Sequence, residues 1–227
     1  MSTQPISKEG KIDFPRQGET FQTYYKLYGS IAESKQAPLI VLHGGPGLTH
    51  DCLDIHSALT AEYDIPVILY DQLGNGRSTH LKEKAPEFWT IDLFIEELEN
   101  IIKYFGIQDR FSLLGHSWGG ILASEFEVRK LPSGLKRLII TNSLAASSLW
   151  NKSNVQLLQE FPQDVQEGVM GGMKDREKFQ PALQKFHAKH GCTVKPVPEG
   201  YKYSLEQVFG ADGDPTVASD PTVASAP

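Results

Sequence analysis

The chain has 227 residues, 40% of them hydrophobic, so it is long enough to bury one good core and a smaller lobe, but hardly two independent domains. Its formal net charge of −6 and its pI near 5.6 argue against nucleic acid or an anionic membrane surface as the main partner. No segment approaches the roughly 18 consecutive apolar residues that a membrane-spanning helix needs.

The first part of the chain alternates between strand and helix patterns. Loose apolar alternation over residues 11–28 predicts a hairpin-like pair of strands. Residues 90–105 carry apolar side chains at helical spacing, with Thr90 as the N-cap and Gly106 as the stop signal. Short apolar runs predict further strands at 38–42, 66–70, 111–114 and 135–141, and helical patterns lie at 51–63 and from the Gly115–Gly119 turn to about 131. This order predicts a mostly parallel sheet with helices on both faces.

The segment 111–120 has the pattern of a buried strand, a sharp turn and the start of a helix. Its turn, Gly115-His-Ser117-Trp-Gly119, is a Gly-x-Ser-x-Gly sequence in the strand-to-helix context of a nucleophile elbow. The glycines let strand and helix pack closely around a serine in a strained conformation. We therefore predict that Ser117 is a nucleophile, with the backbone amide of Trp118 aimed at a developing oxyanion. The alternative is an ordinary glycine-rich turn.

Two further glycine-rich segments follow predicted strands, at 43–47 and 71–78. The carboxyl ends of parallel strands share one edge of a sheet, so we expect both segments near Ser117. His43 is expected to brace its loop by hydrogen bonds rather than to act as a base, and His116 to pack. Asp71 and Arg77 are expected to fix their loop by an internal ion pair.

Together, the three motifs resemble the proline iminopeptidases, which are serine aminopeptidases of the α/β-hydrolase fold. The resemblance extends over about residues 9–209 and implies an α/β-hydrolase core with a helical lid. It implies that Ser117 is the nucleophile and that the backbone amides of Gly45 and Trp118 form the oxyanion hole. The residues that would form a substrate loop are His43, Gly44, Pro46 and Gly47.

The function that this resemblance implies is release of an N-terminal residue, proline or another small or apolar one, from peptides or amino-acid amides. The reaction would pass through an acyl-enzyme on Ser117. It implies no cofactor, because triad chemistry uses only side chains and backbone amides. Cys52 and Cys192 lack metal-ligand spacing and are too few for a disulfide framework, so we expect no metal site and a cytoplasmic location.

We expect three regions along the chain. Residues 1–147 would form the N-terminal part of the hydrolase core, and residues 148–209, which are helical and polar-rich, the lid. Residues 210–227 contain a direct repeat, Asp214–Ser219 followed by Asp220–Ser225. This last region is predicted to be a disordered tail, because it has little apolar surface to bury.

The acid and the base of the triad are not evident. In α/β hydrolases they follow the serine in chain order, on loops after later strands. No buried apolar strand is predicted after Thr141, so we expect the C-terminal strands of the fold to be missing. The strand at 135–141 would then be an uncovered sheet edge that favours self-association. A substitute pair, Asp175 or Glu177 with His187 or His190, would sit in a lid helix, which is a poor place for a rigidly held base.

Three functions therefore stay open. The favoured one is a serine aminopeptidase of the iminopeptidase type, although these residues alone need not perform the reaction. The second is a catalytically dead hydrolase remnant that binds a small amide, a peptide or a protein partner. The third is another ester or amide hydrolase of the same fold. The residue preferred at the substrate's N-terminus is not determined by these patterns.

Overall fold

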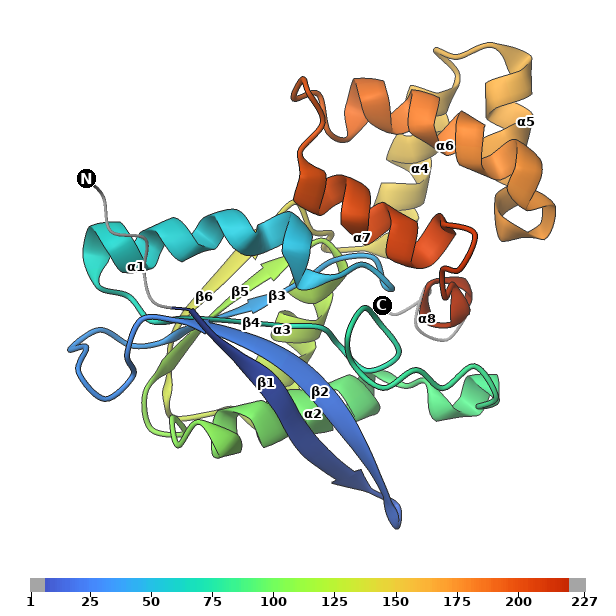
Figure 1. The fold of residues 1–227 in the computed structure, drawn as a ribbon. Helices are drawn as coiled ribbons and strands as arrows, with labels where there is room; N and C mark the ends of the chain where they lie inside the picture. Colours follow the sequence, from blue (N-terminus) through green and yellow to red (C-terminus); the bar gives the residue numbers. More distant parts are fainter. Residues whose placement is uncertain (1–6, 221–227) are drawn as a thin grey trace.

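A six-stranded sheet forms the centre of the protein, in a computed structural model that describes residues 7–220 (Figure 1). The strand order is β1-β2-β4-β3-β5-β6, in which β1 and β2 pair antiparallel and β3 to β6 run parallel. The strands are β1 (Ser7–Arg16), β2 (Glu19–Tyr28), β3 (Leu39–Leu42), β4 (Val67–Tyr70), β5 (Phe111–His116) and β6 (Leu135–Thr141). The predicted mostly parallel sheet is therefore confirmed.

Helices cover both faces of the sheet. Every residue of β3 and β4 is buried, because alternate side chains enter a core on each face. On one face lie α2 (Ile91–Tyr104) and α3 (Trp118–Lys130), and on the other lie η1 (His50–Ser57) and α1 (Ala58–Tyr63). The helix predicted at 51–63 is thus a 3-10 segment followed by a short α-helix.

The predicted bounds of α2 agree with the structure. The Thr90 hydroxyl accepts a hydrogen bond from the Leu93 amide at 3.2 Å, as an N-cap does. After the helix, Gly106 adopts φ +66°, a conformation that favours glycine. Local sequence signals therefore place this helix correctly at both ends.

The lid is helical, as predicted, and stands over the carboxyl ends of the parallel strands (Figure 1). It has a small core of its own, in which Leu158, Val165 and Ala182 are buried. A Cβ on Gly200 would lie 2.2 Å from the Asp51 carbonyl oxygen, so this glycine lets the lid approach η1 closely. The lid elements are α4 (Ser147–Leu158), α5 (Gln163–Gly171), η3 (Gly172–Asp175), α6 (Arg176–His190) and α7 (Glu199–Phe209).

The described part of the tail differs from the sequence-based expectation. Residues 216–219 form a short helix, α8 (Thr216–Ser219), and Val217 is fully buried in the main core. The expectation of disorder is therefore wrong for residues 210–220. One buried valine and a few polar contacts are enough to order this segment, because the core already supplies a groove for it. Residues 221–227 of the expected tail lie outside the described residues.

Strand β6 lies at the edge of the sheet. It pairs with β5 on one side, and within residues 7–220 no strand pairs with its other side. Leu138 and Ile139 are half-buried, whereas Ile140 is 50% exposed. The predicted edge is present, and the self-association expected from it stays a prediction.

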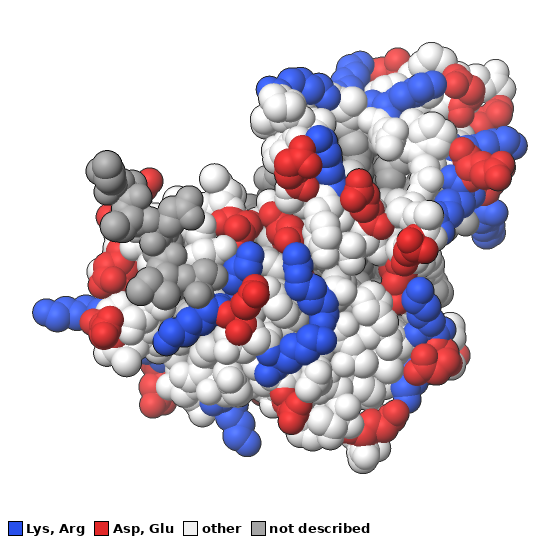
Figure 2. Space-filling view, viewed as in Figure 1, with Lys and Arg blue, Asp and Glu red and all other residues white. Residues whose placement is uncertain are grey.

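The surface carries charges of both signs. Figure 2 shows Lys and Arg side chains interspersed with Asp and Glu over the face in view, without a large field of one sign. In the described part of the chain, no helix has the combination of length and hydrophobicity that crossing a membrane requires.

Candidate active site

Ser117 lies in a tight turn between β5 and α3. Its backbone has φ 54° and ψ −120°, a strained conformation for a residue with a side chain. A Cβ on Gly115 would lie 2.2 Å from the Gly119 carbonyl oxygen, and a Cβ on Gly119 would lie 2.2 Å from that of Leu42. Both flanking glycines are therefore required by the close approach of strand, helix and neighbouring strand. The predicted strand, turn and helix are all present.

The 43–47 loop, which follows β3, passes beside this turn. A Cβ on Gly44 would lie 3.0 Å from Ser117 Cβ and 3.1 Å from His116 Nδ1. Within residues 7–220, the backbone amides of Gly45 and Trp118 donate to no other protein group. The structure thus places two segments with unpaired amides around one serine.

Gln72, in the 71–78 loop after β4, connects these segments. Its side chain is fully buried, where Nε2 donates to the His43 carbonyl oxygen at 3.1 Å and Oε1 accepts from Trp118 Nε1 at 3.0 Å. One amide side chain therefore links the 43–47 loop to the first residue of α3. Gln72 was not among the residues predicted from the sequence, although a glutamine two positions after a predicted buried strand was a signal that could have found it.

His43 has the bracing role expected from the sequence. It is fully buried, and its Nε2 accepts a hydrogen bond from the Gln72 backbone amide at 3.0 Å. Its Nδ1 therefore carries the proton and donates to the Gly44 carbonyl oxygen at 3.0 Å. Burial lowers the pKa of His43, which keeps the ring neutral.

The ion pair predicted between Asp71 and Arg77 is present at 3.5 Å, but the closer contacts of Arg77 are with Asp51, at 2.8 and 3.0 Å. Burial alone would raise the pKa of Asp71, but the hydrogen bond from His50 Nδ1 at 2.8 Å and the charge of His50 outweigh it and lower the pKa to about 2. Ligand atoms of His50, Asp51 and Asp71 lie within 4.8 Å of one another, as metal ligands would. In the structure, both carboxylates also contact the Arg77 guanidinium.

A protein-family model for the alpha/beta hydrolase fold matches residues 37–185. The chain is an α/β hydrolase. It is also similar in sequence to enzymes named proline iminopeptidase. The one from Clostridium botulinum is 35% identical over 174 residues, which are 75% of this chain and 58% of that protein. The one from Lactobacillus delbrueckii subsp. lactis is 34% identical over 184 residues, 79% of this chain and 62% of that protein.

Solved structures agree with this relationship. VinJ superposes with a TM-score of 0.81 at 37% identity, covering 92% of this hydrolase and 70% of VinJ. Proline iminopeptidase from Mycobacterium smegmatis superposes with a TM-score of 0.74 at 33% identity, covering 92% of this hydrolase and 69% of that protein. The predicted fold and family resemblance are therefore confirmed. The hydrolase spans about three-fifths of the length of the curated relatives it matches.

The hydrolase brings no base to the serine within residues 7–220, where no side chain hydrogen-bonds to the Ser117 hydroxyl. His116 packs against Gly44, as expected, and burial lowers the pKa of its ring. The substitute pair considered in the lid does not form. His187 Nδ1 lies 3.1 Å from the Tyr201 hydroxyl, His190 lies 3.8 Å from Glu160, and Asp175 caps α6.

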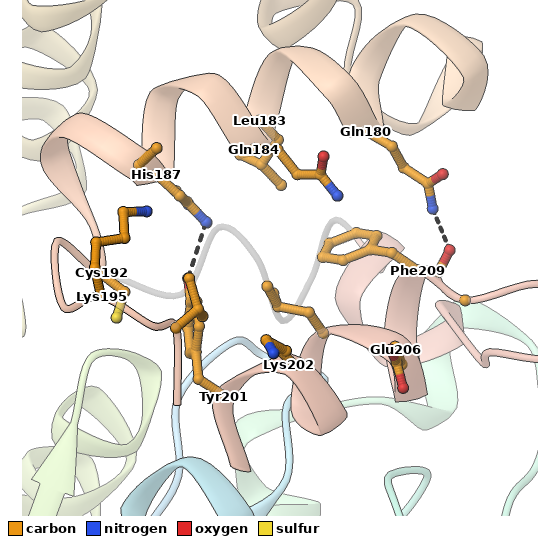
Figure 3. Close-up of a pocket in the computed structure, with 14 residues that line it drawn as sticks. Gln180, Leu183, Gln184, His187, Cys192, Lys195, Tyr201, Lys202, Glu206 and Phe209 are labelled. Carbon is orange, nitrogen blue, oxygen red and sulfur yellow. Dashed lines mark hydrogen bonds between the residues drawn. The ribbon is translucent and has the colours of Figure 1, made fainter. Parts of the chain in front are cut away.

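The lid of this hydrolase contains a cavity of about 540 Å³ between α6 and α7 (Figure 3). The surface that lines it is largely apolar. At one end, His187 and Tyr201 point toward each other (Figure 3). Ser117 and the 43–47 loop do not line it. The cavity is therefore separate from the segments around Ser117.

Proposed function

We propose that the chain carries the nucleophile and the oxyanion hole of a serine aminopeptidase. The observation that carries this proposal is the strained turn at Ser117, together with the unpaired backbone amides of Gly45 and Trp118. We interpret this turn as a nucleophile elbow. Such amides stabilise negative charge only where it develops in the transition state. The remaining members of the substrate loop would be His43, Gly44, Pro46 and Gly47.

In the proposed reaction, Ser117 Oγ attacks the carbonyl carbon of the first residue of a peptide or amino-acid amide. The carbonyl oxygen becomes an oxyanion that accepts hydrogen bonds from Gly45 and Trp118. As the tetrahedral intermediate collapses, the C–N bond breaks, the amine leaves with the proton that Ser117 Oγ gave up, and an acyl-enzyme ester remains on Ser117. Water then hydrolyses this ester and releases the N-terminal residue.

The substrate class is proposed from the relatives, whose names specify proline iminopeptidase. Proline or another small or apolar residue would occupy the N-terminal position of the substrate. We also propose a cytoplasmic location, which is supported by Cys52 and Cys192, neither of which forms a disulfide.

One observation favours a second candidate function. A serine hydrolase needs a base that takes the Ser117 proton, and no histidine of the described residues hydrogen-bonds to that hydroxyl. A catalytically dead hydrolase that binds a small amide or a peptide through the same loops would keep this geometry without needing the base.

A fluorophosphonate probe tests the nucleophile. We expect slow labelling of Ser117, identified by peptide mass, because oxyanion-hole stabilisation alone retains a residual rate of roughly a thousandfold over water. Ser117→Ala should abolish this labelling, while Ser148→Ala, at an exposed serine of the lid, should leave it unchanged. Labelling at the same rate in the Ser117→Ala protein would refute the assignment.

Turnover of a prolyl arylamide, compared with a panel of other aminoacyl arylamides and simple esters, tests the substrate class. Preference for the prolyl compound supports the iminopeptidase proposal. Hydrolysis of esters without arylamides would instead indicate another hydrolase of the same fold. Tight binding of prolyl amides without turnover would favour the binding protein.

A further inference from the structure

The described end of the chain lies in a groove formed by two glycine-bearing loops. A Cβ on Gly74 would lie 2.5 Å from Val217 Cγ2 and 2.7 Å from Trp89 Cη2. A Cβ on Gly47 would lie 2.8 Å from Ala218 Cβ. Because these two glycines lack side chains, the 43–47 and 71–78 loops leave room for Val217, which is fully buried, and for Ala218.

Polar contacts anchor the same segment. Asp214 is 4% exposed, and its Oδ2 accepts a hydrogen bond from His80 Nδ1 at 2.6 Å. Its Oδ1 accepts from the Thr216 amide at 3.1 Å and the Thr216 hydroxyl at 2.6 Å. The other ring nitrogen of His80, Nε2, lies 2.9 Å from the Gly76 carbonyl oxygen. One carboxylate therefore both attaches the segment to the core and shapes its turn.

The side chains that make these contacts all belong to one hexapeptide, Asp214-Pro-Thr-Val-Ala-Ser219. The sequence repeats it at once as Asp220-Pro-Thr-Val-Ala-Ser225. Each side chain that meets the groove, a carboxylate, a threonine, a valine and an alanine, recurs six positions later. Most of the second copy lies outside the described residues.

We propose that the groove is a docking site for the peptide Asp-Pro-Thr-Val-Ala-Ser, and that the second copy occupies it when the first copy is unable to. One copy is bound at a time. His80 would hold the Asp220 carboxylate, and the Val223 side chain would fill the space beside Gly74 and Trp89. This proposal does not depend on the proposed enzymatic function.

Two features explain why the first copy is the one bound. The residue before it is Gly213, where a Cβ would lie 2.8 Å from the Val208 carbonyl carbon and oxygen. The residue before the second copy is Ser219, so its docking requires a local shift. Docking of the second copy also loops out six residues, which disfavours it on the order of tenfold. The second copy is therefore the weaker ligand of the groove, a reserve copy that binds only when the first copy does not.

Three variants of the full chain test the proposal: Val217→Asp, Val223→Asp and the double variant. A buried, unpaired aspartate prevents docking of the copy that carries it. The readout is hydrogen exchange at residues 44–50 and 71–80, which include the Gly74 amide bonded to the Thr79 carbonyl oxygen. We expect wild-type rates in Val223→Asp, and rates roughly tenfold faster in Val217→Asp, where the reserve copy takes over. In the double variant, rates should rise by roughly a further tenfold or more.

Equal rates in Val217→Asp and the double variant would overturn the proposal, because the second copy would then contribute nothing. Accelerated exchange in Val223→Asp alone would also overturn it, since the second copy would be in use already. Wild-type rates in Val217→Asp would overturn it too, because the valine would then not be needed to occupy the groove. If circular dichroism shows that Val217→Asp is unfolded, the same set is made with alanine, which removes only two methyl groups and preserves the comparison.

Discussion

Ser117 shows the clearest conflict between a residue type and its backbone. A side chain at φ 54° and ψ −120° costs about 1–3 kcal/mol, and the strain persists because the surrounding structure imposes it. Gly115 and Gly119 cannot relieve it, because their own positions are determined by close backbone contacts. A glycine would adopt this conformation without the strain, and a strained serine agrees with the nucleophile proposed for this position.

We predict that Ser117→Gly stabilises the protein. Removal of the side chain releases the backbone strain, while the greater flexibility of glycine in the unfolded chain offsets part of the gain, so the net increase is about 1 kcal/mol. Urea unfolding of the variant beside wild type measures it. Ser117→Ala is the control, because it removes the hydroxyl but keeps the Cβ and the strain. An equal gain in both variants would contradict the strain argument.

At the scale of elements, Glu97 connects α2 to the strands that carry the site. It is fully buried. Its carboxylate accepts hydrogen bonds from the Thr23 hydroxyl on β2 at 2.5 Å and from the Leu73 backbone amide in the 71–78 loop at 3.1 Å. Burial raises the pKa of Glu97 to about 7, although these hydrogen bonds partly oppose the rise. The group therefore titrates near neutral pH at the base of the loop that carries Gln72.

We predict that Glu97 makes the protein less stable as pH rises. Below its ordinary pKa of 4.5, the group is protonated in both the folded and the unfolded chain. Between pH 4.5 and about 7, the unfolded chain releases the proton while the folded chain retains it, so stability falls by about 3 kcal/mol and then levels off.

Urea unfolding of wild type and Glu97→Gln from pH 4.5 to pH 8 measures this effect. The stability difference between them should shift by about 3 kcal/mol in favour of the glutamine variant as pH rises. Glu96→Gln is the matched control, since Glu96 lies on the same helix with a side chain that is 45% exposed. Parallel pH curves for wild type and Glu97→Gln would contradict the prediction.

At the scale of the whole molecule, strand β6 leaves one edge of the parallel part of the sheet open. Its outer backbone N–H and C=O groups have no strand partner within residues 7–220. An exposed edge of this kind pairs readily with another chain, and Ile140 adds apolar surface that is 50% exposed.

We predict that the protein self-associates through this edge. Sedimentation velocity should show a weight-average mass that rises with concentration, and Ile140→Lys should weaken the rise because a charge opposes pairing. Ile55→Lys is the control, since Ile55 is exposed to 76% on η1, away from β6. A monomer with a sharp, concentration-independent melting transition would contradict the prediction.

The candidate site was predictable to the extent that it depends on local signals. Ser117 and its flanking glycines follow from a pattern of five residues between a strand and a helix, and the bracing role of His43 from its place before a glycine run. Gln72 was not predicted, because its two partners, His43 and Trp118, are 29 and 46 residues away in sequence. Arg77 also contacts Asp51 more closely than Asp71, although Asp71 is nearer in sequence, and this depends on how η1 packs.

The sequence by itself determined the alternation of strands and helices, the ends of α2, the tight turn at Ser117 and the family. These features depend on neighbouring residues: apolar run length, a capping threonine, and glycines that allow close contacts. Only the tertiary structure decided that Gln72 links two loops, that the lid histidines stay away from Ser117, and that Val217 is buried. Each of these depends on surfaces contributed by distant segments, so a short polar tail that has no core of its own becomes ordered where the core supplies the groove.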